Sequence, residues 1–241
     1  MINNFSTLFL QIFSKNGLDR YCSKDIIEKF EAFTSLLLEE NSHTNLTAIR
    51  QIPDVIAKHY ADSLLAVDCF PQNASVIDIG CGGGFPTFPL AIIRPDLQIT
   101  ALDSTQKKIN FVEKTAKQMH LTNITPICAR AEDPSIANLR ENFQIATSRA
   151  MARMNVLTEL ALPFVAIGGS LIALKGAQGD IEAQEAKNAI SKLGGTLVQN
   201  KSTVLYTETA EEARHILTVK KEAASPKQYP RVYATILKKP L

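Results

Sequence analysis

The sequence predicts an α/β fold with a doubly wound, mainly parallel, seven-stranded sheet and an N-terminal helical extension. Residues 1–70 show only helical apolar spacing, whereas strand-like and helical segments alternate in 71–241. A glycine-rich turn, "DIGCGGGFP" at 78–86, follows the first strand-like segment. We therefore assign 1–70 to an extension packed on an α/β domain that covers 71–241.

Three helices are expected before the sheet. Apolar residues recur at helical spacing in 5–13 and in 23–41, where Ser23 stands as an N-cap. A third helix is expected over 52–70, because Pro53 suits a first helical turn.

Strands and helices then alternate along the α/β domain. The expected strands are 75–80, 97–103, 124–129, 143–149, 168–176, 196–206 and 213–222. The expected helices are 88–95, 104–121, 155–167 and 179–194. This alternation is typical of a doubly wound sheet. The tail 225–241 has three prolines and four cations, and we expect it to be irregular.

Composition and charge narrow the class of protein. The net charge of +2 permits a nucleic-acid partner without requiring one. The four cysteines are scattered without a CxxC pair, so we expect reduced thiols and no metal site. The chain starts without a basic leader, and no apolar run reaches the ~18 residues of a membrane span. We expect a cytoplasmic protein that does not enter a membrane.

The glycine spacing favours one kind of nucleotide-type site. The pattern is D-x-G-x-G-x-G, formed by Asp78, Gly80, Gly82 and Gly84. A dinucleotide G-x-G-x-x-G motif would need glycine at position 85, which is Phe85, and no G-K-[ST] follows for a phosphate loop. The pattern resembles the first motif of class I S-adenosylmethionine-dependent methyltransferases, although a tight strand-to-helix turn alone would also use glycines.

Acids at two further strand ends strengthen the case for a nucleoside site. Asp103 ends the second expected strand, 19 residues after Gly84, where a carboxylate can accept both ribose hydroxyls. The alternative is a carboxylate that stabilises a helix start. In "ARAED" at 129–133, the N–H of Ala131 and the carboxylate of Glu132 can read an adenine edge, or the segment is an ordinary polar loop.

Short motifs follow one another along nearly the whole chain. They are "NLTAIR" at 45–50, "HYADSLL" at 59–65, "DIGCGGGFP" at 78–86, "PLAI" at 89–92, "LDS" at 102–104, "ARAED" at 129–133, "SRA" at 148–150, "ALKG" at 173–176 and "YPR" at 229–231. Together and in this order, they resemble the RsmG (GidB) family of bacterial small-subunit ribosomal RNA guanine-N7 methyltransferases. The resemblance implies a Rossmann-like class I methyltransferase domain and methylation of guanine N7 in 16S ribosomal RNA near the decoding region, which yields 7-methylguanosine.

The resemblance also implies site residues. It implies S-adenosylmethionine contacts at Gly80, Phe85, Ala131, Glu132 and Arg149, to which the spacing argument adds Gly82, Gly84 and Asp103. Arg149 ends the fourth expected strand, where its guanidinium can hold a carboxylate or an RNA phosphate. Lys175 ends the fifth strand and can face the RNA. We expect Arg149 and Lys175 at the methyl-transfer site, with a surface arginine and a solvated lysine as the alternatives. Arg231 is a candidate RNA contact.

Several positions depart from the family pattern. They are Thr87, Phe88, Met151, Arg153, Ala234 and Ile236. The last two replace a glycine and a proline of the tail, so we carry no tail function over beyond Arg231.

The chemistry of guanine N7 needs alignment more than a base. N7 carries a lone pair and no proton, so attack on a sulfonium methyl is an in-line displacement and we assign no general base. The sequence lacks the motifs of two other methylation reactions. It has no [DNS]-P-P-[YF] after the fourth strand, as methylation of an amino group would suggest, and no Pro-Cys nucleophile, as methylation of cytosine C5 would require.

Other polar residues have a functional and a structural interpretation. His59 and Asp62 either form a wall of the cofactor pocket or are packing residues of a helix. The lysines of 104–121 either contact phosphates or form a solvated face. His43, His120 and His215 have no ligand spacing.

Three hypotheses remain at this point. The leading one is a monomeric enzyme that methylates 16S RNA within the small subunit or an assembly intermediate. The fold is also compatible with a small-molecule methyltransferase. A ribosome-assembly factor that only binds RNA is the third, and the intact glycine turn with Asp103 argues against it.

Overall fold

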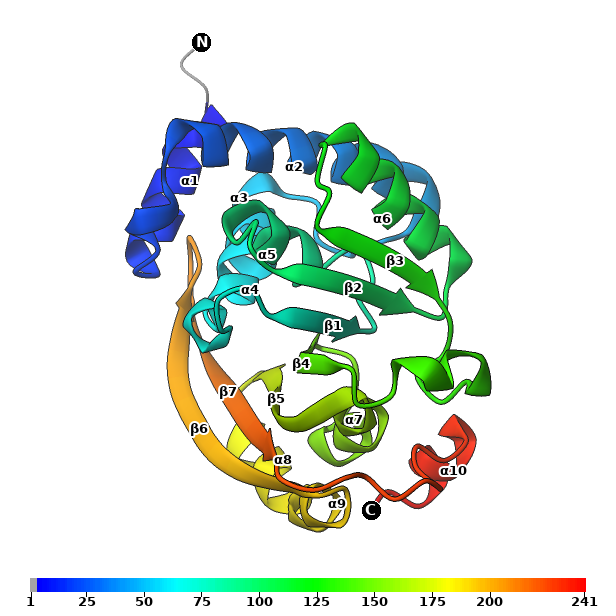
Figure 1. The fold of residues 1–241 in the computed structure, drawn as a ribbon. Helices are drawn as coiled ribbons and strands as arrows, with labels where there is room; N and C mark the ends of the chain where they lie inside the picture. Colours follow the sequence, from blue (N-terminus) through cyan, green and yellow to red (C-terminus); the bar gives the residue numbers. More distant parts are fainter. Residues whose placement is uncertain (1–3) are drawn as a thin grey trace.

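The computed structural model describes residues 4–241, and its centre is a seven-stranded sheet (Figure 1). Residues 1–3 of the expected extension lie outside this range. The strands are β1 (Ser75–Ile79), β2 (Gln98–Asp103), β3 (Ile124–Cys128), β4 (Phe143–Arg149), β5 (Val165–Lys175), β6 (Gly195–Tyr206) and β7 (Glu211–Lys221). Their order is β3-β2-β1-β4-β5-β7-β6; β7 runs antiparallel to β5 and β6, and the other neighbouring strands are parallel. The predicted doubly wound class is confirmed.

Helices cover both faces of the sheet, as a mainly parallel sheet requires (Figure 1). One face carries α1 (Asn4–Lys15), α2 (Lys24–Thr44), α5 (Thr87–Ile93) and α6 (Gln106–Gln118). The other carries α7 (Met154–Ala161), α8 (Gly179–Glu185) and α9 (Lys187–Lys192). Short 3-10 turns occur at η1 (Asp19–Tyr21) and η4 (Pro134–Leu139). Among residues 4–241, no helix has the length and apolar character to cross a bilayer.

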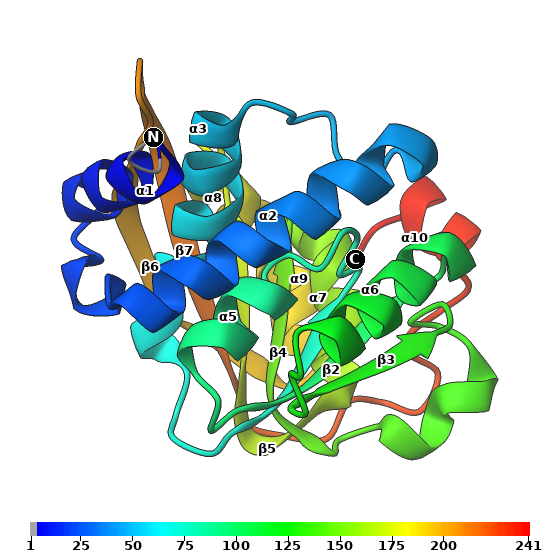
Figure 2. The same ribbon diagram turned by 90° about the horizontal axis from the view of Figure 1, so that it is seen from above.

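The N-terminal helices share their core with the sheet domain. Ser23 caps α2 as predicted, and Figure 2 shows α2 lying across α5 and α6. The ring of Phe33 on α2 lies 4.4 Å from that of Phe88 and 5.7 Å from that of Phe85. Buried residues of α1, α2 and α5 belong to one continuous apolar cluster. These contacts place the extension directly against the glycine turn.

The third expected helix, 52–70, is not one regular α-helix. It consists of α3 (Ile52–Asp54), the π-helix η2 (Val55–Ala61), α4 (Asp62–Leu64) and the 3-10 turn η3 (Val67–Cys69). Apolar spacing over so short a segment does not distinguish α from π geometry. A π-helix is rare and is frequently found at functional sites.

Two further helix predictions need correction. The helix expected over 155–167 ends early: η5 (Leu162–Phe164) contains Pro163, whose missing N–H ends the helix, and β5 already begins at Val165. The helix expected over 179–194 is divided into α8 and α9.

The tail is more regular than expected. It contains the short helix α10 (Tyr233–Lys238), because Ile236 is buried against Val156 and Leu160 of α7.

A buried ion pair fixes the tail to α7. The side chain of Glu159 is fully buried and accepts hydrogen bonds from the backbone N–H of Arg231 at 3.0 Å and from its Nε at 2.7 Å. A second nitrogen of the same guanidinium, Nη2, contacts the other carboxylate oxygen. The Arg231 side chain is therefore paired with Glu159 in this structure.

We expect Arg231→Ala to destabilise the protein by about 3–5 kcal/mol, because it leaves the buried Glu159 carboxylate without its cation. Urea unfolding would measure the loss. Arg153→Ala, which breaks an exposed pair with Glu185, is the matched control and should cost less than about 1 kcal/mol. The pairing explanation fails if the two variants are equally stable.

Candidate functional site

The glycine turn after β1 has a backbone that other residues fit poorly. Gly80 has φ of +75° and Gly84 has φ of +88°. A Cβ on Gly80 would lie 2.7 Å from the Cγ of Met151, and one on Gly84 would lie 2.2 Å from the Phe88 ring. Both positions therefore require glycine for conformation and for space.

A cavity of 580 Å³ lies against this turn at the carboxyl ends of β1 to β4. Its walls include seven of the residues expected to bind a cofactor: Gly80, Gly82, Phe85, Asp103, Ala131, Glu132 and Arg149. Gly84 does not line the cavity and acts only within the turn. His59 lines it, whereas Asp62 lies on a neighbouring cavity. We call the 580 Å³ space the first cavity.

Asp103 joins the turn to the end of β2. It is 8% exposed, and its Oδ2 accepts a hydrogen bond from the N–H of Gly82 at 3.0 Å. Its Oδ1 accepts from the N–H of Thr105 at 2.9 Å, just before α6, and Lys108 Nζ lies 3.6 Å from Oδ2. Each carboxylate oxygen keeps a second lone pair, so these bonds leave room for ribose hydroxyls. The helix-start interpretation and the ligand interpretation are thus compatible.

Asp78 is fully buried beneath the turn. The hydroxyl of Thr87 donates to its Oδ2 at 2.6 Å, and its Oδ1 has no hydrogen-bond partner. Burial raises the pKa of Asp78 to about 7, and the bonds from Thr87 oppose that rise. Thr87, a departure from the family pattern, therefore satisfies an otherwise isolated buried carboxyl.

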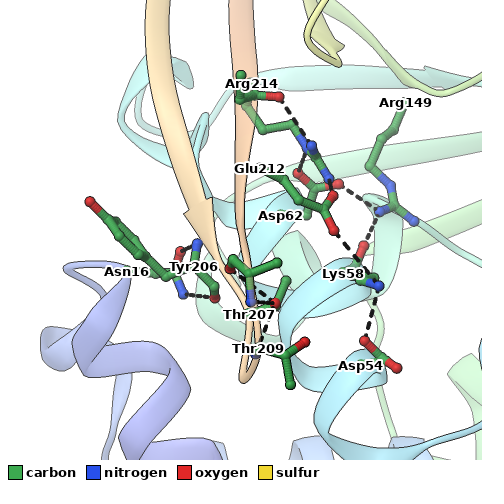
Figure 3. A network of polar contacts seen from close by, with 12 residues as sticks. Asn16, Asp54, Lys58, Asp62, Arg149, Tyr206, Thr207, Thr209, Glu212 and Arg214 are labelled. Carbon is green, nitrogen blue, oxygen red and sulfur yellow. Dashed lines mark hydrogen bonds and ion pairs between the residues drawn. The ribbon is translucent and has the colours of Figure 1, made fainter.

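The guanidinium of Arg149 is held by the extension. It donates to Asp62 Oδ2 at 3.1 Å, to His59 Nδ1 at 2.9 Å and to the carbonyl of Lys58, and it lies 5.3 Å from the Phe85 ring centre. Asp62 also accepts from Arg214 of β7 at 2.7 Å. Figure 3 shows Asp62 between the two arginines.

Further ion pairs extend this network. Glu212 contacts Arg214 and Lys58, and Lys58 contacts Asp54 (Figure 3). The network therefore connects η2, β4 and β7 around Arg149.

His59 is a neutral histidine that lies between Arg149 and Thr47. Burial and the nearby charge of Arg149 lower its pKa to about 3. Because Arg149 must donate to Nδ1, the ring proton lies on Nε2, which donates to the Thr47 hydroxyl at 2.8 Å. The ring stacks on Phe85 with centres 4.2 Å apart. His59 therefore orients its neighbours and has no free nitrogen for a proton.

Lys175 lies on a second cavity, of 400 Å³, which shares Arg149, Ala150 and Met151 with the first. Its side chain is 6% exposed, and its ammonium contacts Glu182 Oε2 at 2.9 Å and donates to the carbonyl of Ala152. Burial lowers the pKa of Lys175, and Glu182 opposes this effect. Lys175 is thus an ion-paired wall residue and not a solvated lysine.

The remaining polar candidates lie elsewhere. Arg231 lines neither cavity, and Lys114 and Lys117 pair with Glu40 and Glu113. Within residues 4–241, no three His, Cys, Asp or Glu side chains are arranged to hold a metal.

Sequence reasoning missed several wall residues of the first cavity. They are Leu46, Thr47, Met151, Leu160 and Tyr233. Of the lysines of 104–121 that were weighed as phosphate contacts, Lys108 lines this cavity. For Leu46 and Thr47, the motif "NLTAIR" was the available signal.

Comparison with known proteins identifies relatives over most of the chain. A family model described as "GidB: rRNA small subunit methyltransferase G" matches residues 26–216. A protein named ribosomal RNA small subunit methyltransferase G from Clostridium beijerinckii is 44% identical over 97% of this chain and 99% of its own length. A protein of the same name from Macrococcus caseolyticus is 41% identical over 97% of each chain.

Solved structures at low identity share the fold alone. M. jannaschii TYW2 in complex with AdoMet aligns with a TM-score of 0.52 at 16% identity, covering 63% of this chain and 70% of its own. The [4+2]-cyclase SpnF aligns with a TM-score of 0.55 at 14% identity, covering 81% and 95%. A protein in complex with AdoMet and a cyclase on one fold show that the fold does not decide the reaction.

The buried Asp78 should make stability depend on pH. Its pKa is about 7 in the folded protein and ordinarily 3.8, so the folded state holds the proton more tightly. The contribution of this group to the free energy of unfolding therefore falls as the pH rises from 3.8 to 7. Asp78→Asn removes this dependence and should gain roughly 2–3 kcal/mol relative to wild type between pH ~5 and pH ~8.

Urea unfolding of both proteins at the two pH values would measure the gain. Asp133→Asn is the control, because Asp133 is partly exposed and its pKa is lowered from 3.8, outside this window. Parallel pH profiles for wild type and Asp78→Asn would contradict the assignment.

Proposed function

The chain belongs to the GidB family of small-subunit ribosomal RNA methyltransferases, and from this premise we propose that it transfers the methyl group of S-adenosylmethionine to N7 of a guanine in 16S ribosomal RNA, near the decoding region. One observation carries the proposal: the first cavity brings the glycine turn, Asp103 and Arg149 together at the ends of β1, β2 and β4. Ligands of doubly wound folds bind at this edge of the sheet.

The residues of the first cavity fit S-adenosylmethionine. Its 580 Å³ lies within the range of about 300–1,000 Å³ for small-molecule sites. Asp103 would hold the ribose hydroxyls, and Ala131 with Glu132 would hold the adenine edge. Gly80 and Gly82 line the cavity with positive φ and carry no side chain, so their backbone would be accessible to the cofactor. The bound cofactor supplies a methyl group on a positively charged sulfur.

The protein groups at this site align the reactants and exclude water. Guanine N7 has no proton to lose, so the reaction needs no general base. His59 would not act as one, because both of its ring nitrogens are hydrogen-bonded to protein groups. Phe85, His59 and Arg149 form a packed wall. A fixed wall of this kind lowers the entropy lost when donor and acceptor are brought into line.

The proposal also covers domain organisation, cellular location, oligomeric state and the form of the RNA substrate. Residues 71–241 form the methyltransferase domain and residues 1–70 the extension packed on it. The protein acts in the cytoplasm as a monomer, on 16S RNA within the small subunit or an assembly intermediate. Arg149 and Lys175 lie where the acceptor would approach, which supports a role for both in RNA contact. Arg231 as an RNA contact stays a prediction, since its side chain pairs with Glu159.

Methyl transfer to small subunits that lack their native modification tests the function. Labelled S-adenosylmethionine is supplied, free 16S RNA is run beside the subunits, and both are digested to nucleosides. We expect label in 7-methylguanosine, and more of it with subunits than with free RNA. Label in another nucleoside, or no label while the cofactor binds, would contradict the proposal.

Asp103→Asn should weaken cofactor binding by about 1.5–3 kcal/mol, because the charged acceptor for the ribose is lost. Calorimetric titration with S-adenosylmethionine would measure this. Asp96→Asn is the matched control, since Asp96 is an ion-paired acid near the start of β2 with Arg94 as its partner. Equal affinity of Asp103→Asn and wild type would remove Asp103 from the site.

A further inference from the structure

The second cavity is the next space that an acceptor can enter. Its 400 Å³ is lined from the ends of β4 and β5, and Arg149, Ala150 and Met151 separate it from the first cavity. Ala150 has φ of +52°, a left-handed conformation that is costly for a residue with a Cβ. Such strain is concentrated at functional sites. The wall between the cavities is therefore unusual in its backbone as well as in its position.

One carboxylate in this cavity has an unused acceptor. Glu182 of α8 accepts at Oε2 from the N–H of Met154 at 2.8 Å, and the same oxygen contacts Lys175 Nζ at 2.9 Å. No residue in 4–241 donates a hydrogen bond to its Oε1, although Glu182 lines the cavity. The pair with Lys175 holds the carboxylate in place. Two lone pairs of Oε1 are thus available to a ligand.

This arrangement complements guanine among the RNA bases. The Watson–Crick edge of guanine carries two neighbouring donors, N1–H and the N2 amino group, which a carboxylate accepts. Adenine has an acceptor at N1 and would place a lone pair against Oε1. On the guanine ring, N7 lies on the side away from these donors. A base held by Glu182 would therefore direct N7 away from α8.

We propose that the second cavity binds the acceptor guanine and that Glu182 recognises it through N1–H and the N2 amino group, an inference that rests on the proposed function. Charge adds to this recognition. When N7 takes up a methyl group, the purine gains one positive charge and its N1–H becomes a stronger donor. The hydrogen bond to Glu182 then strengthens toward the transition state, which raises kcat as well as selecting the base.

A cycle that combines a protein variant and a base variant tests this. The guanosine methylated by wild type is located first and is then replaced by inosine, which keeps N7 and O6 and lacks the N2 amino group. We expect Glu182→Gln to lower kcat/KM for guanosine subunits about ten- to hundredfold, with unchanged S-adenosylmethionine affinity. Inosine should lower kcat/KM for wild type about tenfold. It should have little further effect on kcat/KM of Glu182→Gln, because the protein change and the base change remove the same interaction.

Two further variants serve as controls for loss of a carboxylate on α8 and for loss of charge beside Lys175. Glu185→Gln on the same helix removes a carboxylate that pairs with the exposed Arg153, and it should keep the full inosine effect of wild type. Glu182→Asp keeps the charge beside Lys175 and shortens the reach, so it should behave like Glu182→Gln if contact with the base matters. Unchanged kcat/KM for Glu182→Gln, or inosine and Glu182 effects that multiply independently, would overturn the inference while wild-type methylation of guanosine leaves the proposed function intact. Absence of wild-type label in guanosine would instead overturn the proposed function, and this inference with it.

Discussion

The buried guanidinium of Arg149 is the constraint around which the site is built. A charge taken out of water is tolerated only when it is paired and hydrogen-bonded. Here the partners come from the N-terminal segment: Asp62, the Nδ1 of His59 and the carbonyl of Lys58. The end of β4 therefore cannot adopt its observed arrangement unless η2 and α4 are packed against it. This makes the helical extension part of the site and not an appendage to the sheet.

An aromatic core fixes that extension. Phe30 on α2 contacts Tyr60 of η2 with ring centres 4.7 Å apart, and Phe33 reaches Phe88 of α5. Tyr60 is fully buried, and its hydroxyl pairs with Thr34 at 2.7 Å. Because Tyr60 is adjacent to His59, burial of one ring directs the other onto Phe85. Apolar packing remote from the cavity thus determines the orientation of residues on its wall.

The sequence was sufficient for features that have a local cause. Alternating apolar segments located all seven strands, and the D-x-G-x-G-x-G spacing located a turn whose Gly80 and Gly84 have positive φ. The sequence was insufficient for features whose conformation depends on contacts between residues far apart in the chain. The π-helix η2 and the helix α10 depend on tertiary packing, as does the pairing of Arg231 with Glu159, which lies 72 positions away. The choice between an RNA-facing and a solvated Lys175 stayed open from the sequence, because its partner Glu182 is on another element.

The topology explains why one side of the site was easier to recognise than the other. The chain runs outward through β1, β2 and β3 and then crosses to β4 on the opposite side of β1, so β1 and β4 form the switch point. The first cavity lies over β1 to β4, and its side at β1 is formed by the backbone of the glycine turn, whose conformation fixes the glycine spacing that the sequence shows as a motif. The second cavity lies over β4 and β5. Its Lys175 stands in the short motif "ALKG", whereas Glu182 on α8 belongs to no motif. Arg149 is the charged residue of the wall that both cavities share, so its fixed position sets the boundary between the first cavity and the second.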